Sequence, residues 1–462
     1  MDPVILARLQ FALTIGFHFI FPPITIGLAW LLVIAEGFGW RKKSDDWVRV
    51  GKFFGKLFAL TFAIGVATGI VMEFQFGTNW AHYSKFVGDI FGAPLAAEGI
   101  FAFFLESSFL GLYLFGRNRV SKGVHWFSIL MVAVGATFSA FWIIVANSWQ
   151  QTPDGYILEN GRAELVDFAA AVFNPSTLPR YFHTIVASLI TGAFFMGGIS
   201  AYLVLKKRSI EVSGRSLKLS VGFGIIASFL AVFPTGHFHA EQVARTQPEK
   251  FAAIEGLYDD SDSDRAPMVL FALPFTDPPE LKATVEIPGL LGFMAFGDPN
   301  AEIKNLRDFP PDEVPKGAEL WLSFVSFHNM VILGMFFIGM MCLGALLIWK
   351  KREQDTDSFI SRWWLKLMVV ATFLPVAANE FGWVTAEVGR QPWIVYKMLR
   401  TADGISATVS AGEILTSIIM FGLIYLLLGA LWLYLLATKI NMGPPGPAQI
   451  ATSEIETARE TA

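Results

Sequence analysis

The sequence predicts an all-α polytopic membrane protein with about nine transmembrane helices. Three observations predict this fold: a high hydrophobic content, the recurrence of long apolar runs, and basic residues on alternate connections. Hydrophobic residues make up 54% of the chain and charged residues only 16%, whereas a soluble globular protein carries about 25% charged residues.

A helix needs about 20 mainly apolar residues to cross the hydrocarbon core of a bilayer. Runs of this length recur throughout the chain. The predicted spans cover residues 5–35, 53–76, 95–115, 124–148, 180–205, 217–235, 321–349, 363–386 and 411–438. The first run is too long and too poor in N-terminal basic residues for a cleaved signal peptide, so we interpret it as a span.

Clusters of Lys and Arg follow the first, third, fifth and seventh runs, as in Lys206-Lys207-Arg208. The connections after the second and fourth runs carry few basic residues. Because cytoplasmic loops are enriched in Lys and Arg, we expect the N-terminus outside and the C-terminus in the cytoplasm. An odd number of spans requires the same arrangement.

The chain is predicted to hold one transmembrane domain, residues 1–440. Residues 235–320 form a long extracytoplasmic loop between spans six and seven, and a loop of this length is uncommon unless it is functional. Residues 441–462 are small, polar and acidic after a Gly/Pro-rich start, which predicts a disordered cytoplasmic tail.

Charge and cysteine content exclude several classes of site. A net charge of −4 over 462 residues gives no reason to expect nucleic acid as a partner. The single cysteine, Cys342, excludes an intrachain disulfide and Cys-ligated clusters. A metal in this chain must therefore be held by His, Met or carboxylate.

The end of the eighth span carries Glu380, Trp383, Glu387 and Arg390. A charge at membrane depth costs about 2.5–3.5 kcal/mol on insertion scales unless it has a partner. A metal or cofactor would suit the carboxylates, and an anionic group would suit the Arg. The alternative is a helix cap with an interfacial belt of Arg and Trp.

His18 lies well inside span one, and His183 about one turn into span five. Met330 lies about 13 Å into span seven, so His183 and Met330 can approach one another in the outer leaflet. A His/Met pair is an axial ligand set for low-spin haem, although Met330 alone could simply pack. The other histidines at loop edges, His82, His125, His237 and His239, are expected to be solvated.

Span three carries Glu98 and Glu106, which an ideal helix places about 12 Å apart along its axis and about 80° apart around it. Acids inside a membrane are candidates for proton relays, and the alternative is a structural role with hydrogen-bonded partners. Ser139 in span four could serve a proton wire or only pack.

Lys250 and Glu255 flank a short apolar turn in the long loop. An acid and a base beside an aromatic could bind and deprotonate a quinol. The alternative is a charge pair on the surface.

Several segments together resemble subunit I of cytochrome bd-type quinol oxidase, in the same order from about residue 5 to 440. The segments are FALT (11–14) leading to His18, MEFQFGTNW (72–80), GDIFGAPL (88–95) continuing to Glu106, KFAAIE (250–255) and AEVGRQPW (386–393).

This resemblance implies a haem-bearing domain with two haem b, one low-spin and one high-spin, and one haem d, leaving open a third haem b in its place. It implies that His183 and Met330 bind the low-spin haem. His18 and Glu387 would bind the two high-spin haems, and which of them holds haem d stays open. The remaining implied roles are Glu98, Glu106 and Ser139 in the proton path, Trp383 between haems, Arg390 on a propionate, and Lys250 with Glu255 in the quinol loop.

The resemblance also implies a function in the bacterial cytoplasmic (inner) membrane. Quinol would be oxidised at the outer face and O2 reduced to water with cytoplasmic protons, which generates membrane potential without pumping. The expected partners are subunit II, in a heterodimer, and membrane quinol, with a small single-span accessory subunit left open. Two rivals remain: a diheme quinone oxidoreductase with another acceptor, and a cofactor-free transporter.

The sequence departs from the family pattern in three places. His328 stands where many members carry Arg, which offers a rival ligand near Met330. The quinol loop is of the shorter kind, and span six ends in PTGHFH (234–239), where an acidic residue usually follows the glycine. The quinone type therefore stays open.

Overall fold

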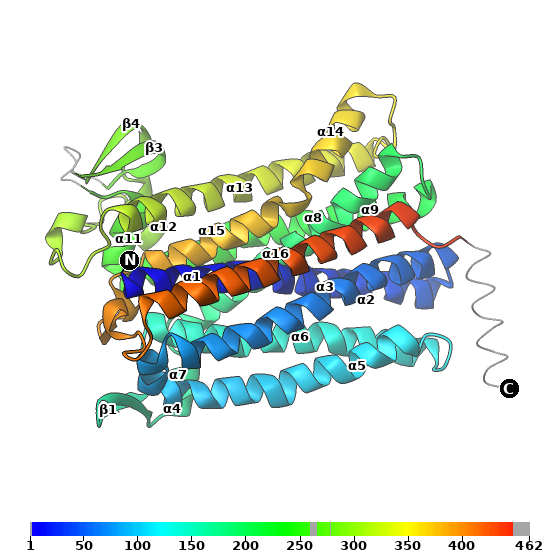
Figure 1. Ribbon diagram of the computed structural model, residues 1–462. Coiled ribbons are helices and arrows are strands. Elements are labelled where there is room, and N and C mark those ends of the chain that lie inside the picture. Colours follow the sequence, from blue (N-terminus) through cyan, green and yellow to red (C-terminus); the bar gives the residue numbers. More distant parts are fainter. Residues whose placement is uncertain (1, 259–265, 278, 447–462) are drawn as a thin grey trace.

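Nine helical segments of the described chain are long and apolar enough to cross a membrane, as predicted. The computed structural model describes residues 2–258, 266–277 and 279–446, and Figure 1 shows the segments side by side in one bundle. The spans are α1 (Pro3–His18) with α2 (Phe21–Lys42); α3 (Asp45–Thr78); α4 (Ala81–Ala97) with η1 (Glu98–Phe103) and α5 (Phe104–Phe115); α6 (Lys122–Gln151); α7 (Phe168–Val172) with α8 (Thr177–Leu205); α9 (Ile210–Leu230) with η2 (Ala231–Gly236) and α10 (His237–Thr246); α13 (Ala318–Trp349); α14 (Phe359–Val370) with η4 (Ala371–Phe373) and α15 (Leu374–Val388); and α16 (Ala411–Met442).

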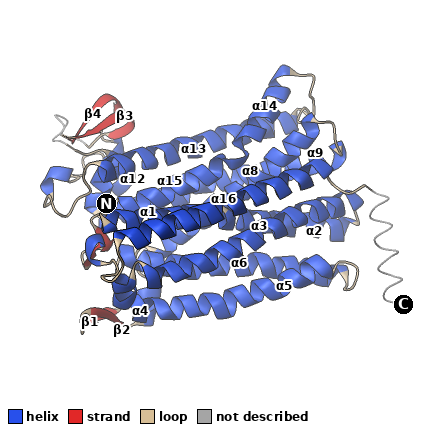
Figure 2. Ribbon diagram, viewed as in Figure 1, coloured by secondary structure: helices blue, strands red, loops and turns tan. Residues whose placement is uncertain are grey.

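Small elements cover the end of the bundle where the N-terminus lies, and all labelled strands are found there (Figure 2). They form three antiparallel strand pairs and several short helices. The pairs are β1 (Tyr156–Glu159) with β2 (Arg162–Leu165), β3 (Met268–Thr276) with β4 (Pro279–Ile287), and β5 (Trp393–Val395) with β6 (Leu399–Arg400); the helices are α11 (Pro248–Glu255), α12 (Leu290–Phe296), η3 (Leu306–Asp308) and η5 (Thr401–Asp403).

The first span is broken, which the sequence prediction missed. Helix α1 ends at His18 and α2 begins at Phe21, just before Pro22 and Pro23. A proline has no N–H to donate and clashes with the carbonyl four residues earlier, so an unbroken helix cannot pass this point. The break leaves His18 at a helix end inside the bundle.

Two spans contain a π-helical segment, each associated with a proline. Pro94 lies one turn before η1, and Pro234 lies within η2. The predicted α-helical offset between Glu98 and Glu106 therefore does not apply, because the chain between them is wound differently. The helical segment of the sixth span continues to Thr246, beyond residue 235, where the predicted span ends.

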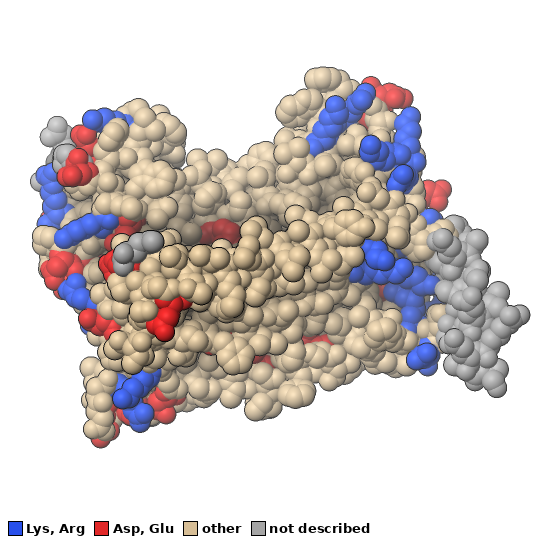
Figure 3. All heavy atoms as spheres, viewed as in Figure 1, with Lys and Arg blue, Asp and Glu red and all other residues tan. Residues whose placement is uncertain are grey.

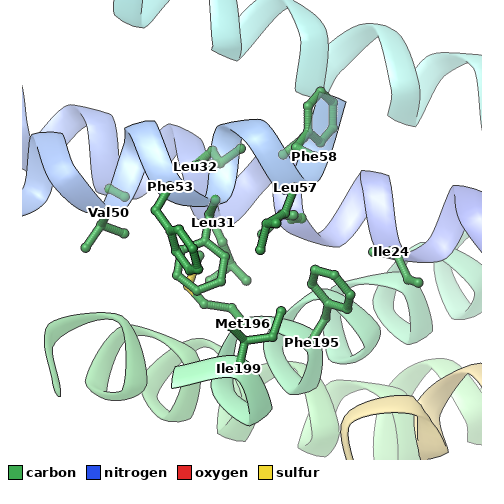
Figure 4. Close-up of a cluster of buried hydrophobic side chains, with 14 of the residues drawn as sticks. Ile24, Leu31, Leu32, Val50, Phe53, Leu57, Phe58, Phe195, Met196 and Ile199 are labelled. Atoms are coloured by element: carbon green, nitrogen blue, oxygen red, sulfur yellow. The ribbon is translucent and has the colours of Figure 1, made fainter. Parts of the chain in front are cut away.

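The largest apolar core lies between α2, α3 and α8, as Figure 4 shows. Apart from Ile24 in the first turn of α2, its labelled side chains lie in the middle of these helices or in their halves remote from the loop end of the bundle. The labelled side chains are Ile24, Leu31 and Leu32 of α2, Val50, Phe53, Leu57 and Phe58 of α3, and Phe195, Met196 and Ile199 of α8.

Charged side chains gather at both ends of the molecule, with a broad band of mainly uncharged side chains between them (Figure 3). The connections predicted to be basic, α2–α3, α5–α6, α8–α9 and α13–α14, meet at one end, together with the end of α16. The N-terminus and the long loop lie at the opposite end.

Candidate functional site

One cavity of about 1070 Å³ runs through the half of the bundle nearest the long loop. Small-ligand pockets are typically about 300–1,000 Å³, so this volume suits more than one bulky ligand. Apart from Glu380, the residues that the sequence suggested as site residues line it. They are His18, Glu98, Glu106, Ser139, His183, Lys250, Glu255, Met330, Trp383, Glu387 and Arg390.

His18 contacts a threonine hydroxyl through Nδ1. The Thr68 hydroxyl lies 3.0 Å from the carbonyl oxygens of Ile64 and Gly65, to either of which it can donate. The same hydroxyl lies 3.0 Å from His18 Nδ1, and a hydroxyl that donates to the helix backbone accepts a hydrogen from this nitrogen. The lone pair then resides on Nε2, which has no hydrogen bond within the described residues.

His183 repeats this arrangement on another pair of helices. Thr235 in η2 donates to the Leu230 carbonyl at 2.9 Å, and its oxygen lies 3.4 Å from His183 Nδ1. The π-helical segment η2 also brings Gly236 against the ring, since a Cβ there would lie 3.5 Å from Cε1. His183 Nε2 is again left without a hydrogen bond in the part of the chain that is described.

Met330 on α13 lines the cavity where α13 packs against α15. Its Sδ would lie 3.0 Å from a Cβ added at Gly382, so only glycine leaves the thioether this close to the helix that carries Trp383. His328 is not a rival ligand. Both of its ring nitrogens lie 3.0 Å from backbone carbonyl oxygens, those of Phe324 and Val269.

Glu387 lies at the centre of a buried polar network. Arg390 donates to its Oε2 at 2.6 Å, and Asn147 donates to its Oε1 at 2.9 Å. Arg180 in turn donates to the Asn147 side chain. Arg390 is only 4% exposed, so it is packed inside the protein and does not lie on its lipid-facing surface.

The network carries an excess of positive charge. Arg180 and Arg390 share the single carboxylate of Glu387, and Lys250 is close enough to all three to interact electrostatically. Buried charges require a partner, so the loop end of the cavity is suited to an anionic group.

The acids of the third span contact the fourth. Ser139 Oγ donates to Glu98 Oε1 at 2.7 Å, and Glu106 is buried against α6, where Gly135 has no side chain to displace it. Glu98 therefore has a hydrogen-bonding partner, as the structural alternative expected. Both acids nevertheless line the cavity.

Lys250 and Glu255 are not a surface pair, since they are only 5% and 3% exposed. Lys250 Nζ donates to three neutral acceptors, Gln151, Gln247 and the Ala386 carbonyl, at 3.0–3.4 Å. Burial and the nearby Arg180 and Arg390 hold the pKa of Lys250 well below its usual range. Burial raises the pKa of Glu255 to about 8, and its Oε2 has no hydrogen-bonding partner.

Sequence reasoning gave no site role to Arg180, Asn147 or His239. Arg180 lies three residues before His183, and this spacing on a helix places both on one face, which could have identified it. His239 was expected to be solvated, but it lines the cavity with its ring 5.5 Å from that of His183. His125 is buried as well, with Nε2 3.0 Å from the Tyr113 carbonyl.

The donor set does not suit a bare metal ion. No group of three or more His, Cys, Asp or Glu side chains in the described chain could hold one. The donors instead come singly or in pairs from different helices. Such donors suit a metal whose remaining ligands come from an organic macrocycle, as the resemblance to haem proteins implies.

Comparisons with known proteins agree with this geometry. Residues 6–444 match the family model described as cytochrome bd terminal oxidase subunit I. The chain is 40% identical to cytochrome bd ubiquinol oxidase subunit 1 of Bacillus subtilis (strain 168), covering 96% of this chain and 94% of the relative. It is 34% identical to cytochrome bd-II ubiquinol oxidase subunit 1 of Escherichia coli (strain K12), covering 96% and 97%.

A solved structure of bd oxidase from Geobacillus thermodenitrificans has the same fold, with a TM-score of 0.86 and 31% sequence identity. The match covers 96% of this chain and 99% of that chain. The chain therefore belongs to the cytochrome bd terminal oxidase subunit I family: it is a multi-pass protein of the bacterial inner membrane and a subunit of a terminal quinol oxidase.

Proposed function

We propose that this chain is the haem-bearing catalytic subunit, which oxidises quinol at the outer face and reduces O2 to water with cytoplasmic protons. Membrane potential would arise from this arrangement without pumping. One observation carries the proposal: a single cavity connects the buried Lys250 and Glu255 of the loop to imidazole, thioether and carboxylate donors deeper in the bundle.

The residues present fit haem groups. His183 and Met330 would hold the low-spin haem, and His18 and Glu387 the two high-spin haems. The Nδ1 contacts of Thr68 and Thr235 favour this assignment, because they leave Nε2 of each ring free to bind iron. Two haem b and one haem d, or a third haem b in its place, would supply the one-electron transfers and the site of oxygen reduction.

Cationic and aromatic side chains would orient the bound groups. Arg390, with Arg180 on the other side of Glu387, supplies guanidinium donors suited to propionate carboxylates. Trp383 follows Gly382, the residue packed against Met330, and would separate the low-spin site from the high-spin pair. These side chains would also exclude water from the loop end of the cavity.

At the loop end, Lys250 would hold the quinol oxygen and Glu255 would accept a proton. The buried, unpartnered Oε2 of Glu255 supports this role, since a general base must be free to bind the proton that it accepts. The protons would then leave on the outer side.

On the opposite side of the cavity, Glu106, Ser139 and Glu98 would pass protons inward from the cytoplasm. The Ser139–Glu98 hydrogen bond supports part of this route. Because the donors lie in the half of the bundle nearest the long loop, cytoplasmic protons must cross much of the membrane to reach them. That movement of charge generates the potential.

The proposal includes a heterodimer with subunit II. Helix α16 has only 11% of its most apolar window buried, and the span 81–115 only 17%, so both could contact a second subunit as well as lipid. The same faces could hold a small single-span accessory subunit. The relatives include proteins named as ubiquinol and as menaquinol oxidases, so the proposal specifies quinol only.

The test uses the purified complex with its natural partner. A reduced-minus-oxidised spectrum with haem extraction should show haem b together with haem d or a further haem b, and a colourless protein would rule out the oxidase and favour the cofactor-free transporter. Oxygen uptake with quinol should fall strongly in Glu387→Ala and stay normal in Glu159→Gln, an exposed control. Normal uptake in Glu387→Ala would overturn the ligand assignment, and a coloured wild-type protein without uptake would favour the diheme reductase.

A further inference from the structure

His328 joins two parts of the molecule that are distant in sequence. It lies on α13, its Nδ1 is 3.0 Å from the Phe324 carbonyl of the same helix, and its Nε2 is 3.0 Å from the Val269 carbonyl of β3. The ring also stacks on that of Phe324, with centroids 3.9 Å apart. This is the sole side-chain hydrogen bond between β3 and α13 within the residues that the structure describes.

Neighbours of both partners in this hydrogen bond line the cavity. On β3, Met268 precedes Val269 and lines the loop end of the cavity together with Glu255. On α13, Met330 follows His328 by two residues and lines the same cavity. His328 therefore lies between a wall of the proposed quinol site and the proposed haem ligand.

The segment after α11 packs closely against Phe324, the residue on which the His328 ring stacks. Gly256, directly after Glu255, has φ +78°, and a Cβ there would lie 2.8 Å from the Phe324 ring. Tyr258 packs on the other side, with its ring 6.2 Å from Phe324. The aromatic contacts of Tyr258, Phe324 and His328 thus connect the segment after α11 with α13.

We propose that His328 is a positioning residue for quinol oxidation: by binding the Val269 carbonyl, it fixes the wall of the quinol site at a set distance from Met330. The roles of β3 in quinol binding and of Met330 in haem binding rest on the proposed function. The hydrogen bond between His328 and the Val269 carbonyl does not. A side chain that can donate a hydrogen bond to the Val269 carbonyl should replace His328, whereas an apolar side chain of similar size should not. Arg has several N–H donors, so His328→Arg is the conservative replacement.

The experiment compares His328→Leu and His328→Arg in the purified two-subunit complex. Asn329→Ala is the matched control, because Asn329 donates at 2.8 Å to the Val325 carbonyl of its own helix and not to the loop. Amide hydrogen exchange of residues 268–276, measured without quinol, should accelerate about tenfold in His328→Leu. It should stay near the wild-type rate in His328→Arg and Asn329→Ala.

Steady-state kinetics with a soluble quinol supply the second measurement. His328→Leu should raise KM about three- to tenfold with less than a twofold change in kcat, and His328→Arg should restore KM. Unchanged exchange in β3 together with unchanged KM would overturn the proposal. Faster exchange with unchanged KM would also overturn the positioning role, since the strand would then be released without affecting quinol binding.

Two further measurements keep the outcome unambiguous. If His328→Leu does not assemble, His328→Gln, whose amide can donate to the Val269 carbonyl but cannot stack as a ring on Phe324, should show an intermediate rise in exchange and KM. The spectrum of the wild-type complex distinguishes a failure of this proposal from a failure of the proposed oxidase function. A wild-type complex without haem would reject the proposed function, whereas the exchange rates would still decide whether His328 holds the loop.

Discussion

At the scale of single residues, His18 and His183 show how the fold prepares a side chain for one chemical role. In both cases a threonine hydroxyl satisfies a backbone carbonyl and the Nδ1–H of the ring. The sequence indicated the histidines because an imidazole at membrane depth is unfavourable without a partner. It could not indicate Thr68 and Thr235, since their contacts depend on how separate helices pack.

Replacement of Met330 by Leu tests the low-spin ligand set. Removal of the thioether should lower the reduction potential of the low-spin haem, because a Met ligand raises it, and should change the low-spin spectrum. The control is Met335→Leu on the same helix, where the side chain is 52% exposed and does not line the cavity. A redox titration of both variants that gave the same potential would reject Met330 as a ligand.

The pH dependence of quinol oxidation tests Glu255. Burial raises the pKa of Glu255 to about 8, so the carboxyl is mainly protonated below that pH and cannot accept a proton. We therefore expect kcat/KM to rise with pH up to about 8. Glu255→Gln should abolish this rise and lower kcat/KM about 10²-fold.

The control for this profile is Glu249→Gln on the same helix. Glu249 binds Lys397 and Tyr396, and these contacts hold its pKa below the usual range. Removal of the Glu249 carboxylate should leave the rise of kcat/KM with pH unchanged. A rise that persisted in Glu255→Gln would assign the proton acceptor to another group.

At the scale of helices, the spans themselves were predictable and their interruptions were not. Apolar length determines whether a segment crosses a bilayer, and all nine predicted spans are present in the described chain. The break before Pro22 and the π-helical segments near Pro94 and Pro234 depend on how the chain satisfies freed backbone groups. Contacts with neighbouring helices determine how these groups are satisfied, so hydropathy did not predict the interruptions.

The crossing of α2 and α8 gives a prediction for stability. A Cβ at Gly27 would lie 2.1 Å from the Ser188 carbonyl oxygen, and small residues allow membrane helices to approach this closely. Gly27→Ala should force the helices apart and destabilise the protein by about 1–3 kcal/mol. The control is Gly222→Ala on α9, where the added methyl would meet no atom within 4 Å.

Thermal unfolding of the two variants in detergent provides the measurement. Gly27→Ala should lower the midpoint, whereas Gly222→Ala should leave it unchanged or raise it slightly, because alanine favours a helix by about 1 kcal/mol. Equal midpoints in the two variants would show that the close approach of α2 and α8 does not contribute to stability.

At the scale of the whole molecule, the cavity lies in the half of the bundle nearest the long loop, whereas most of the largest apolar core lies toward the other end. The helix on which each site residue lies was predictable from the sequence, but the sequence could not show that Arg180, Asn147, Glu387 and Arg390 meet. They come from α8, α6 and α15 and the segment after it. Contacts of this kind between separate spans follow from the packing of the whole bundle.

The orientation of the bundle in the membrane decides the direction in which protons must travel. The basic connections meet at one end and the long loop at the other, so the positive-inside rule predicts that the loop lies outside. We would replace the single cysteine by Cys342→Ser and introduce Asn300→Cys in the loop or Lys350→Cys at the basic end. In right-side-out spheroplasts, a membrane-impermeant thiol reagent should label only the Asn300→Cys variant, and lysis should expose the Lys350→Cys variant. The reverse pattern would place Glu255 on the cytoplasmic side, and quinol oxidation would then release protons inward and could not generate the proposed potential.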